Sequence, residues 1–323
     1  MLKACRLLIV IEFVLMAAMP IPVDAQVPTP SFEKRVINDK LGRPVTYYAS
    51  RSRKPAPLLL MIQGSGCTPV LASVNGGSTI YNLGPYADEQ RFTVIAVEKP
   101  NAETRPKNTG TAKECSAKFN EDFTAASWLE ALRASIADAR KSPSVDKRRT
   151  LVIGFSEGAV MASLLAARDP KITEVVSLGG SGTTQLFDLL VGAYGCFNRN
   201  TCLAQVEAQA KAIASKPGSS TDFAWGHPYK RWTSFFSVEP ADELLRSKAR
   251  VYVVFGTQDE SVPPPSQELI AAKLMSAGRD VTVRRVADAG HNLLPKNSGD
   301  WSALDGELRA ALDWFWQVPL ENN

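Results

Sequence analysis

The sequence predicts one α/β domain with a mostly parallel central sheet, helices on both faces and an inserted helical cap. Three observations support this fold class. Apolar runs of strand length recur along the chain, and amphipathic helical patterns lie between them. One interval between two such runs is far longer than a crossover needs. The 323 residues, 45% of them hydrophobic, are enough for a sizeable core.

The strands are expected where aliphatic and β-branched residues cluster. Residues 35–50 hold two short strands separated by the turn sequence LGRP. The continuously apolar runs that follow are typical of strands buried on both faces of a parallel sheet. They lie at 57–63, 92–98, 149–155, 174–180 and 250–256. A more mixed run at 281–286 suits a strand nearer the edge of the sheet.

Helices are expected where apolar residues recur at spacings of three and four. This pattern covers 125–140 and 301–315, and an alanine-rich helix over 158–169 stops before Pro170. The long interval is 181–248, between two predicted strands, and we expect it to form a cap over the end of the sheet.

The first 25 residues have the layout of a secretory signal peptide. Lys3 and Arg6 precede an apolar run, and Ala25 ends a stretch that suits cleavage. An uncleaved membrane anchor or a misassigned start codon are the alternatives. We therefore expect a mature domain over 27–323 that is secreted or periplasmic. No later stretch approaches the ~18 to 20 apolar residues of a membrane span.

Cysteine usage agrees with export. Cys5 would leave with the signal peptide, and the even number that remains suggests two disulfides. Cys196 and Cys202 flank a short polar stretch and suit a local bridge, which leaves Cys67 to pair with Cys115. Free buried thiols are the alternative. None of the spacings resembles a metal site.

The charge pattern bears on partners. A net charge of +4, with no basic cluster interleaved with aromatic residues, argues against a nucleic-acid partner. Lys99, Arg105, Lys107 and Lys113 form a basic stretch after the strand at 92–98. It is either a solvated loop or a feature that favours an acidic substrate. Nothing in the sequence indicates an oligomeric state.

The pentapeptide GFSEG ends one predicted strand and opens the next predicted helix. In a strand–turn–helix of this kind Ser156 takes a strained backbone conformation that lifts its hydroxyl above the sheet. Gly154 and Gly158 remove side chains that would collide with the neighbouring strand and helix. This pattern is typical of a nucleophile elbow.

A serine nucleophile needs a base and an orienting acid. The chain has two histidines. His291 follows the last predicted strand and is our candidate base, whereas His227 lies in the cap. Asp259 follows the strand at 250–256 and is our candidate acid, ahead of Glu260 and Asp288.

The order Ser156, Asp259, His291 is that of α/β-hydrolases, and GFSEG, GTQD and AGH match the elbow, acid loop and histidine loop of that family. From about residue 45 to 318 the sequence resembles the α/β-hydrolase fold superfamily. Within it the chain is most similar to dienelactone-hydrolase-like or prolyl-oligopeptidase-like members. The resemblance implies a serine hydrolase.

The family builds its oxyanion hole from two backbone N–H groups. One belongs to the residue after the nucleophile, here Glu157. The other comes from the loop after the strand at 57–63, which reads QGSGC, with Gln63 where the family usually has histidine. By position the donor is Ser65, with Gly66 as the alternative. A Cys67–Cys115 disulfide would rigidify this loop.

The expected reaction is hydrolysis of a carboxylic ester through an acyl-enzyme, with no metal or organic cofactor. A peptidase of the prolyl-oligopeptidase or aminopeptidase kind is the alternative enzyme. An exopeptidase needs an acidic anchor for the substrate amine, for which Glu98 and Glu157 are candidates. A non-catalytic binding protein is the alternative outside enzymes.

Aromatic residues gather in the cap, in the stretch FAWGHPYKRWTSFF. Trp225, Trp232 and Phe235, with Tyr229 and Phe236 nearby, either line an acyl pocket or form the cap's own small core.

Overall fold

The computed structural model describes residues 32–318, apart from 51, 53, 75–76, 80–90, 103–111 and 296–297. The predicted signal peptide at 1–25 lies outside the described residues, as do Arg105 and Lys107 of the basic stretch.

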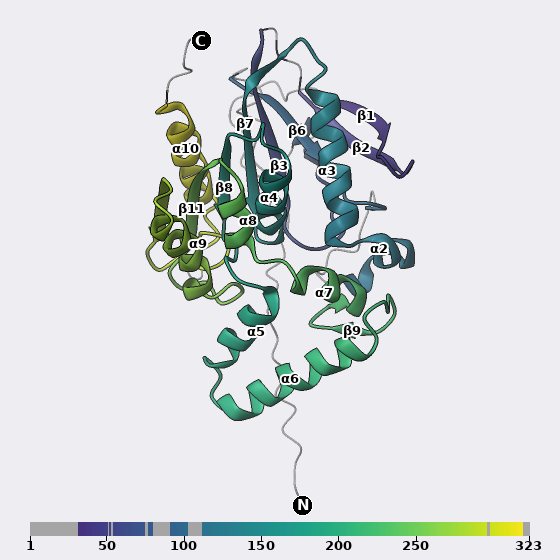
Figure 1. Ribbon diagram of the computed structural model, residues 1–323, viewed down its shortest axis with the longest axis vertical. Helices are drawn as coiled ribbons and strands as arrows, with labels where there is room; N and C mark the ends of the chain where they lie inside the picture. Colours follow the sequence, from purple (N-terminus) through teal and green to yellow (C-terminus); the bar gives the residue numbers. More distant parts are fainter. Residues whose placement is uncertain are drawn as a thin grey trace, which may run out of the picture.

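An eight-stranded sheet forms the centre of the molecule (Figure 1). In spatial order its strands are β1 (Glu33–Asn38), β2 (Pro44–Ala49), β6 (Thr93–Val97), β3 (Ala56–Ile62), β7 (Val145–Phe155), β8 (Glu174–Leu178), β11 (Arg250–Gly256) and β12 (Val281–Val286). From β6 to β12 all neighbours are parallel, while β2 is antiparallel to both β1 and β6. The predicted mostly parallel sheet is confirmed. Parallel strands bring the chain segments after β3, β7, β11 and β12 to one edge.

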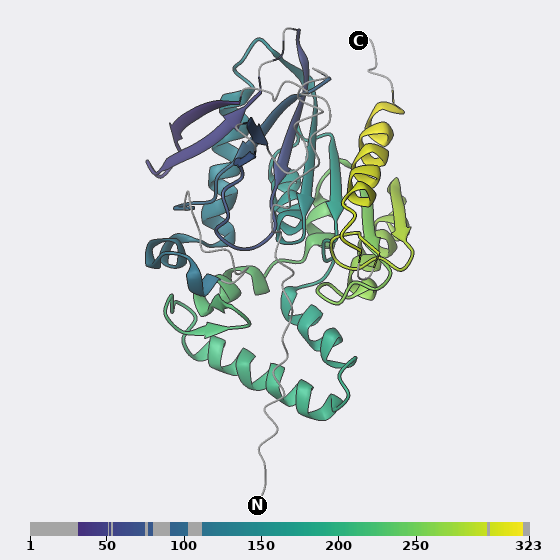
Figure 2. The same cartoon turned by 180° about the vertical axis from the view of Figure 1, so that it is seen from behind.

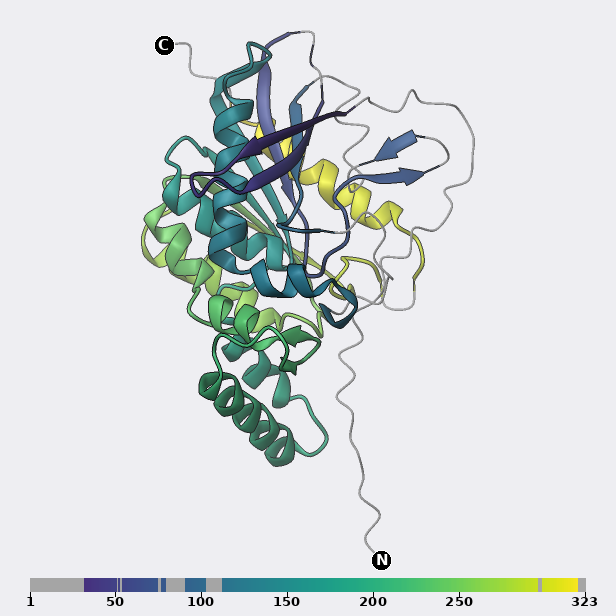
Figure 3. The same ribbon diagram turned by 90° about the vertical axis from the view of Figure 1, so that its right-hand side faces the viewer.

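Helices cover both faces of this sheet (Figures 1 and 3). On one face lie α3 (Ala125–Ala139), α4 (Glu157–Arg168), α8 (Pro240–Arg246) and α9 (Pro264–Ser276), which share the larger apolar core. On the other face α10 (Ser302–Trp316) packs on the alternate residues of the same strands. Helix α9 has no counterpart among the predicted helices, because it opens within a run of three prolines.

The chain between β8 and β11 projects from the carboxyl edge of the sheet. It forms α5 (Gln185–Ala193), α6 (Arg199–Ser215), a hairpin of β9 (Phe223–Ala224) and β10 (His227–Pro228), and α7 (Tyr229–Phe236). Figure 2 shows α5 and α6 beyond the end of the sheet. Helix α8, which ends this interval, packs with α4 and α9 instead.

Shorter elements lie in the connections between β3 and β7. They are the hairpin of β4 (Ala72–Val74) and β5 (Gly77–Thr79), the 3₁₀ turn η1 (Ala112–Glu114) and α2 (Ala117–Asp122). Across the described ranges, no helix combines the length and the apolar character that crossing a bilayer requires.

One of the two predicted disulfides is formed. Cys67 and Cys115 form a disulfide that joins the loop after β3 to the turn after η1. The second predicted disulfide is wrong, because Cys196 and Cys202 are free thiols in contact with each other. Apolar packing between α5 and α6 holds this turn, with Cys202 buried in it, and Asn198 caps α6.

Candidate active site

Ser156 lies at the sharp turn where β7 ends and α4 begins. Its backbone has φ 55° and ψ −120°, a conformation that a residue with a side chain rarely adopts. A Cβ atom on Gly154 would lie 2.2 Å from the carbonyl oxygen of Gly158. A Cβ atom on Gly158 would lie 2.2 Å from the carbonyl oxygen of Ile62 in β3. Only glycine fits at either position, so the turn keeps its shape.

Three loops at the carboxyl edge bring their side chains together. The imidazole of His291, after β12, lies with Nε2 3.0 Å from Oγ of Ser156. Its Nδ1 lies 2.9 Å from Oδ2 of Asp259, after β11. The loops after β11 and β12 pack backbone to backbone, since a Cβ on Gly256 would lie 2.1 Å from the carbonyl oxygen of Ala289. This close packing fixes the separation of the histidine and the carboxylate.

The Asp259 carboxylate is buried and held by donors on both oxygens. Oδ1 accepts the backbone N–H groups of Ser261 and Val262, each at 2.9 Å. Oδ2 accepts the side-chain amide of Gln267 at 2.9 Å in addition to contacting His291. Sequence reasoning missed Gln267, which is fully buried in the first turn of α9. The sequence sign that could have indicated this contact is a polar residue eight positions after Asp259, within the next helix.

The alternative acids lie elsewhere. The side chain of Glu260 is exposed beside the buried acid. Asp288 belongs to its own loop, where Oδ1 accepts the amide of Gln258 at 3.1 Å and the backbone N–H donates to the hydroxyl of Thr257.

The alternative base is enclosed in the cap. His227 is 2% exposed, and its ring stands edge-on to Trp232 with ring centroids 5.6 Å apart. Burial, and then the positive charges of Arg231 and Lys99, hold the pKa of His227 well below its ordinary value.

The loop after β3 lies against the elbow. A Cβ atom on Gly64 would lie 3.5 Å from Cβ of Ser156, so this backbone closely approaches the serine. Ser65 follows in the same loop and is half-buried. Across from it, Glu157 opens α4, and a helix leaves its first N–H groups without intrahelical acceptors. Both predicted oxyanion donors therefore belong to backbone beside Ser156.

A family comparison bears on this arrangement. The model of the alpha/beta hydrolase family matches residues 59–300, which include the elbow, the acid loop and the histidine loop. The chain belongs to the alpha/beta hydrolase family. A search of curated proteins found no match.

Solved structures share the fold of this chain at low sequence identity. An acylaminoacyl peptidase from Pyrococcus horikoshii has TM-score 0.57 at 12% identity, over 82% of this chain and 38% of that one. A puromycin-hydrolyzing peptidase from Mycobacterium tuberculosis has TM-score 0.59 at 15% identity, over 91% and 41%. A Klebsiella pneumoniae protein proposed to be a dienelactone hydrolase has TM-score 0.57 at 17% identity, over 89% and 99%. The chain thus spans less than half the length of these two peptidases.

The basic stretch after β6 does not behave as one surface. Lys99 is 2% exposed, so reading it as part of a solvated or substrate-facing basic loop is wrong. The ammonium donates to the carbonyl oxygens of Gly64 and Gly66 instead. Lys113 is exposed. The one sequence sign that the side chain of Lys99 is buried was its position directly after a buried strand.

The two acidic residues considered as amine anchors also point into the protein. The carboxylate of Glu98 accepts the backbone N–H of Val70 at 3.1 Å, and burial raises its pKa to about 7. The side chain of Glu157 is 3% exposed and forms an ion pair with Arg231 of α7.

The aromatic residues of the cap pack mostly on each other. Trp232 is 6% exposed, and its indole N–H donates to the carbonyl of Ala224 at 2.6 Å. Phe235 is fully buried, with its ring 6.1 Å from that of Phe123. Both side chains lie in the interior, and Trp225 is half-buried beside Trp232. Within the described part of the chain, no group of three or more His, Cys, Asp and Glu side chains could hold a metal ion.

Proposed function

We propose that this protein is a hydrolase that cleaves carboxylic esters through an acyl-enzyme formed on Ser156. The observation that carries the proposal is the position of His291, with one ring nitrogen 3.0 Å from the serine hydroxyl and the other 2.9 Å from Asp259. This is the relation of nucleophile, base and orienting acid that acyl transfer requires.

In the first step Ser156 Oγ attacks the ester carbonyl while His291 Nε2 takes the hydroxyl proton. Asp259 keeps the imidazole in the tautomer with hydrogen on Nδ1 and stabilises the imidazolium. The proton then passes to the leaving alcohol, and the acyl group stays on the serine. Water repeats the sequence on the acyl-enzyme, which releases the acid and restores the hydroxyl.

Negative charge develops on the carbonyl oxygen in both steps. The backbone N–H groups of Ser65 and Glu157 are the proposed donors to this oxyanion. A further partial positive charge comes from the N-terminus of α4, which begins at Glu157.

The choice of ester over peptide rests on the two acidic candidates. An aminopeptidase needs a free carboxylate at the site to bind the substrate amine. Glu98 and Glu157 are both engaged with groups inside the protein. Neither is available as an anchor, which favours a neutral ester substrate.

The test combines labelling with a substrate panel. We expect a fluorophosphonate probe to label the wild-type protein at Ser156 and to leave Ser156→Ala unlabelled. We expect turnover of short-acyl nitrophenyl esters to exceed that of aminoacyl anilides, and Ser156→Ala to abolish it. Preference for the anilides would favour a peptidase. An unlabelled, inactive wild type would favour a binding protein.

We further propose that the protein is exported and that its mature chain begins after Ala25. The Cys67–Cys115 disulfide supports this, because stable disulfides are typical of oxidising compartments. N-terminal sequencing of protein from fractionated cells tests it. A protein that keeps Met1 and stays in the cytoplasm would contradict it.

A further inference from the structure

Three charged side chains are buried together beneath the elbow. Lys99 follows β6 and is 2% exposed, Glu157 opens α4 and is 3% exposed, and Arg231 lies on α7 and is 3% exposed. Arg231 binds Oε2 of the glutamate, and the lysine ammonium lies 3.9 Å from Oε1. One carboxylate thus faces two cations.

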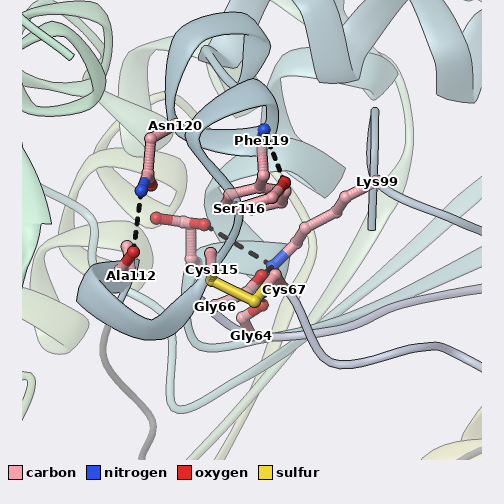
Figure 4. The surroundings of a disulfide bond; sticks show 10 residues. Gly64, Gly66, Cys67, Lys99, Ala112, Cys115, Ser116, Phe119 and Asn120 are labelled. Carbon is pink, nitrogen blue, oxygen red and sulfur yellow. Dashed lines mark hydrogen bonds and ion pairs between the residues drawn. A yellow bond between two sulfur atoms is a disulfide. The ribbon is translucent and has the colours of Figure 1, made fainter. Parts of the chain in front are cut away.

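The ammonium of Lys99 binds two backbone acceptors in the loop after β3. It donates to the carbonyl oxygen of Gly64 and, at 2.7 Å, to that of Gly66, close to the Cys67–Cys115 disulfide (Figure 4). The rings of Trp128 and Phe123 cover it, at 4.5 and 5.2 Å from their centroids. Aromatic cover keeps water away, so the two carbonyls are the principal acceptors.

Binding the Gly64 carbonyl has a consequence for the next N–H. The C=O of Gly64 and the N–H of Ser65 belong to one planar trans peptide unit, in which they point in opposite directions. A cation that fixes the carbonyl therefore fixes the direction of the N–H. It also polarises the unit and strengthens the donor.

We propose that Lys99 is a positioning residue that aims and strengthens the Ser65 N–H toward the oxyanion. The inference rests on the proposed function, because it assigns this N–H to the oxyanion hole. Lys99 does not touch the reacting atoms, and it acts through the Gly64–Ser65 peptide.

The lysine is not needed to balance the charge of Glu157. Burial lowers the pKa of Lys99 to about 8, with the Glu157 charge opposing the shift and the Arg231 charge adding to it. Replacing the lysine with an apolar side chain leaves Arg231 and Glu157 as a balanced ion pair. Such a replacement leaves no unpaired buried charge, and its cost to stability is the loss of the two hydrogen bonds to the carbonyls of Gly64 and Gly66.

The experiment compares Lys99→Met with a matched variant, Arg149→Met. Arg149 is also a buried cation: it donates to the carbonyls of Phe315 and Val318, pairs with Glu174, and stacks on the Phe315 ring at 3.6 Å. It lies in β7 at the amino end of the parallel strands, away from the site.

We expect Lys99→Met to lower kcat for a nitrophenyl ester about ten- to a hundredfold, with KM within twofold and a smaller loss of melting temperature than in Arg149→Met. A trifluoromethyl ketone, which forms a tetrahedral oxyanion adduct, should bind more weakly by the same factor as kcat/KM falls. Arg149→Met should lose melting temperature and keep kcat.

An unchanged kcat in Lys99→Met would overturn the proposal, as would a loss of activity that tracks melting temperature in both variants. If Lys99→Met does not fold, Lys99→Gln is the test variant. The proposal then requires its kcat to fall at least fivefold at constant KM, and a wild-type kcat overturns it. A wild type that no fluorophosphonate labels would instead reject the proposed function itself.

Discussion

At the scale of single residues, the backbone around Ser156 allows little variation. A Cβ on Gly158 would meet the end of β3 at 2.2 Å, and backbone atoms cannot move aside as a flexible side chain can. Gly192 is also helical but lies in the exposed part of α5, where a Cβ would have nothing within 4 Å. The two glycines form a matched pair for substitution.

We expect Gly158→Ala to lower the free energy of unfolding by about 3 kcal/mol or more through the steric clash with β3. Gly192→Ala should raise it by about 0.5 to 1 kcal/mol, because alanine favours the helix. Urea unfolding monitored by circular dichroism measures both. Equal effects of the two substitutions would contradict the packing described for the elbow.

The side-chain amide of Gln267 supports the carboxylate of Asp259, the proposed acid. Gln267→Met keeps the volume of the side chain and removes the donor to Asp259 Oδ2. We expect kcat to fall about tenfold with little change in KM, because a lost hydrogen bond to a charged group is worth about 1.5 kcal/mol or more.

The control is Gln258→Met, since Gln258 makes the same type of bond to the exposed Asp288. It should retain wild-type kcat. A normal rate in Gln267→Met would mean that the acid needs no support from α9.

At the scale of elements, the loop after β3 is fastened at three points. Lys99 holds two of its carbonyls, Glu98 accepts the N–H of Val70, and the disulfide ties Cys67 to Cys115. A loop without regular structure can hold a rigid position only when such bonds replace a hydrogen-bonded ladder. The disulfide also closes a segment with a sequence separation of 48 residues.

We expect the double variant Cys67→Ser, Cys115→Ser to lose about 4 kcal/mol of unfolding free energy, as the closure of a loop of this length predicts. We also expect a lower kcat, because the loop after β3, which holds the proposed oxyanion donor, loses one of its three attachments. Chemical denaturation and ester kinetics measure the two effects. Cys196→Ser, which breaks no disulfide, is the control, and wild-type kinetics and stability in the double variant would contradict the role of the bond.

At the scale of the whole molecule, buried carboxyl groups tie stability to pH. Burial raises the pKa of Glu98 to about 7, from an ordinary value near 4.5. Between these two values the folded chain keeps a proton that the unfolded chain has released. The free energy of unfolding contributed by this group therefore falls as pH rises from about 4.5 to about 7.

We expect Glu98→Gln, which keeps an oxygen for the Val70 N–H, to match wild-type stability at pH 4. At pH 8 it should exceed wild-type stability by about 1 to 3 kcal/mol. Urea midpoints at the two pH values give the difference, in which the contributions of other groups cancel. A difference independent of pH would contradict a raised pKa for Glu98.

The residue pattern alone was enough to predict the sheet, the elbow and the three side chains of Ser156, Asp259 and His291 that meet at its edge. These features depend on local pattern: apolar runs mark buried strands, and two glycines around Ser156 mark a turn that no side chain fits. The positions of Asp259 and His291 followed because parallel strands end at one edge of a sheet.

Which polar side chains are buried became apparent from the packing of the folded chain. The sequence predicted Lys99 as part of a basic stretch. Gln267 lies in α9, a helix that was not predicted because it begins within a run of prolines. Trp232 and Phe235 entered the cap interior, and Cys196 and Cys202 remained thiols. The burial and partners of a side chain depend on elements far away in sequence, and no local pattern encodes those contacts.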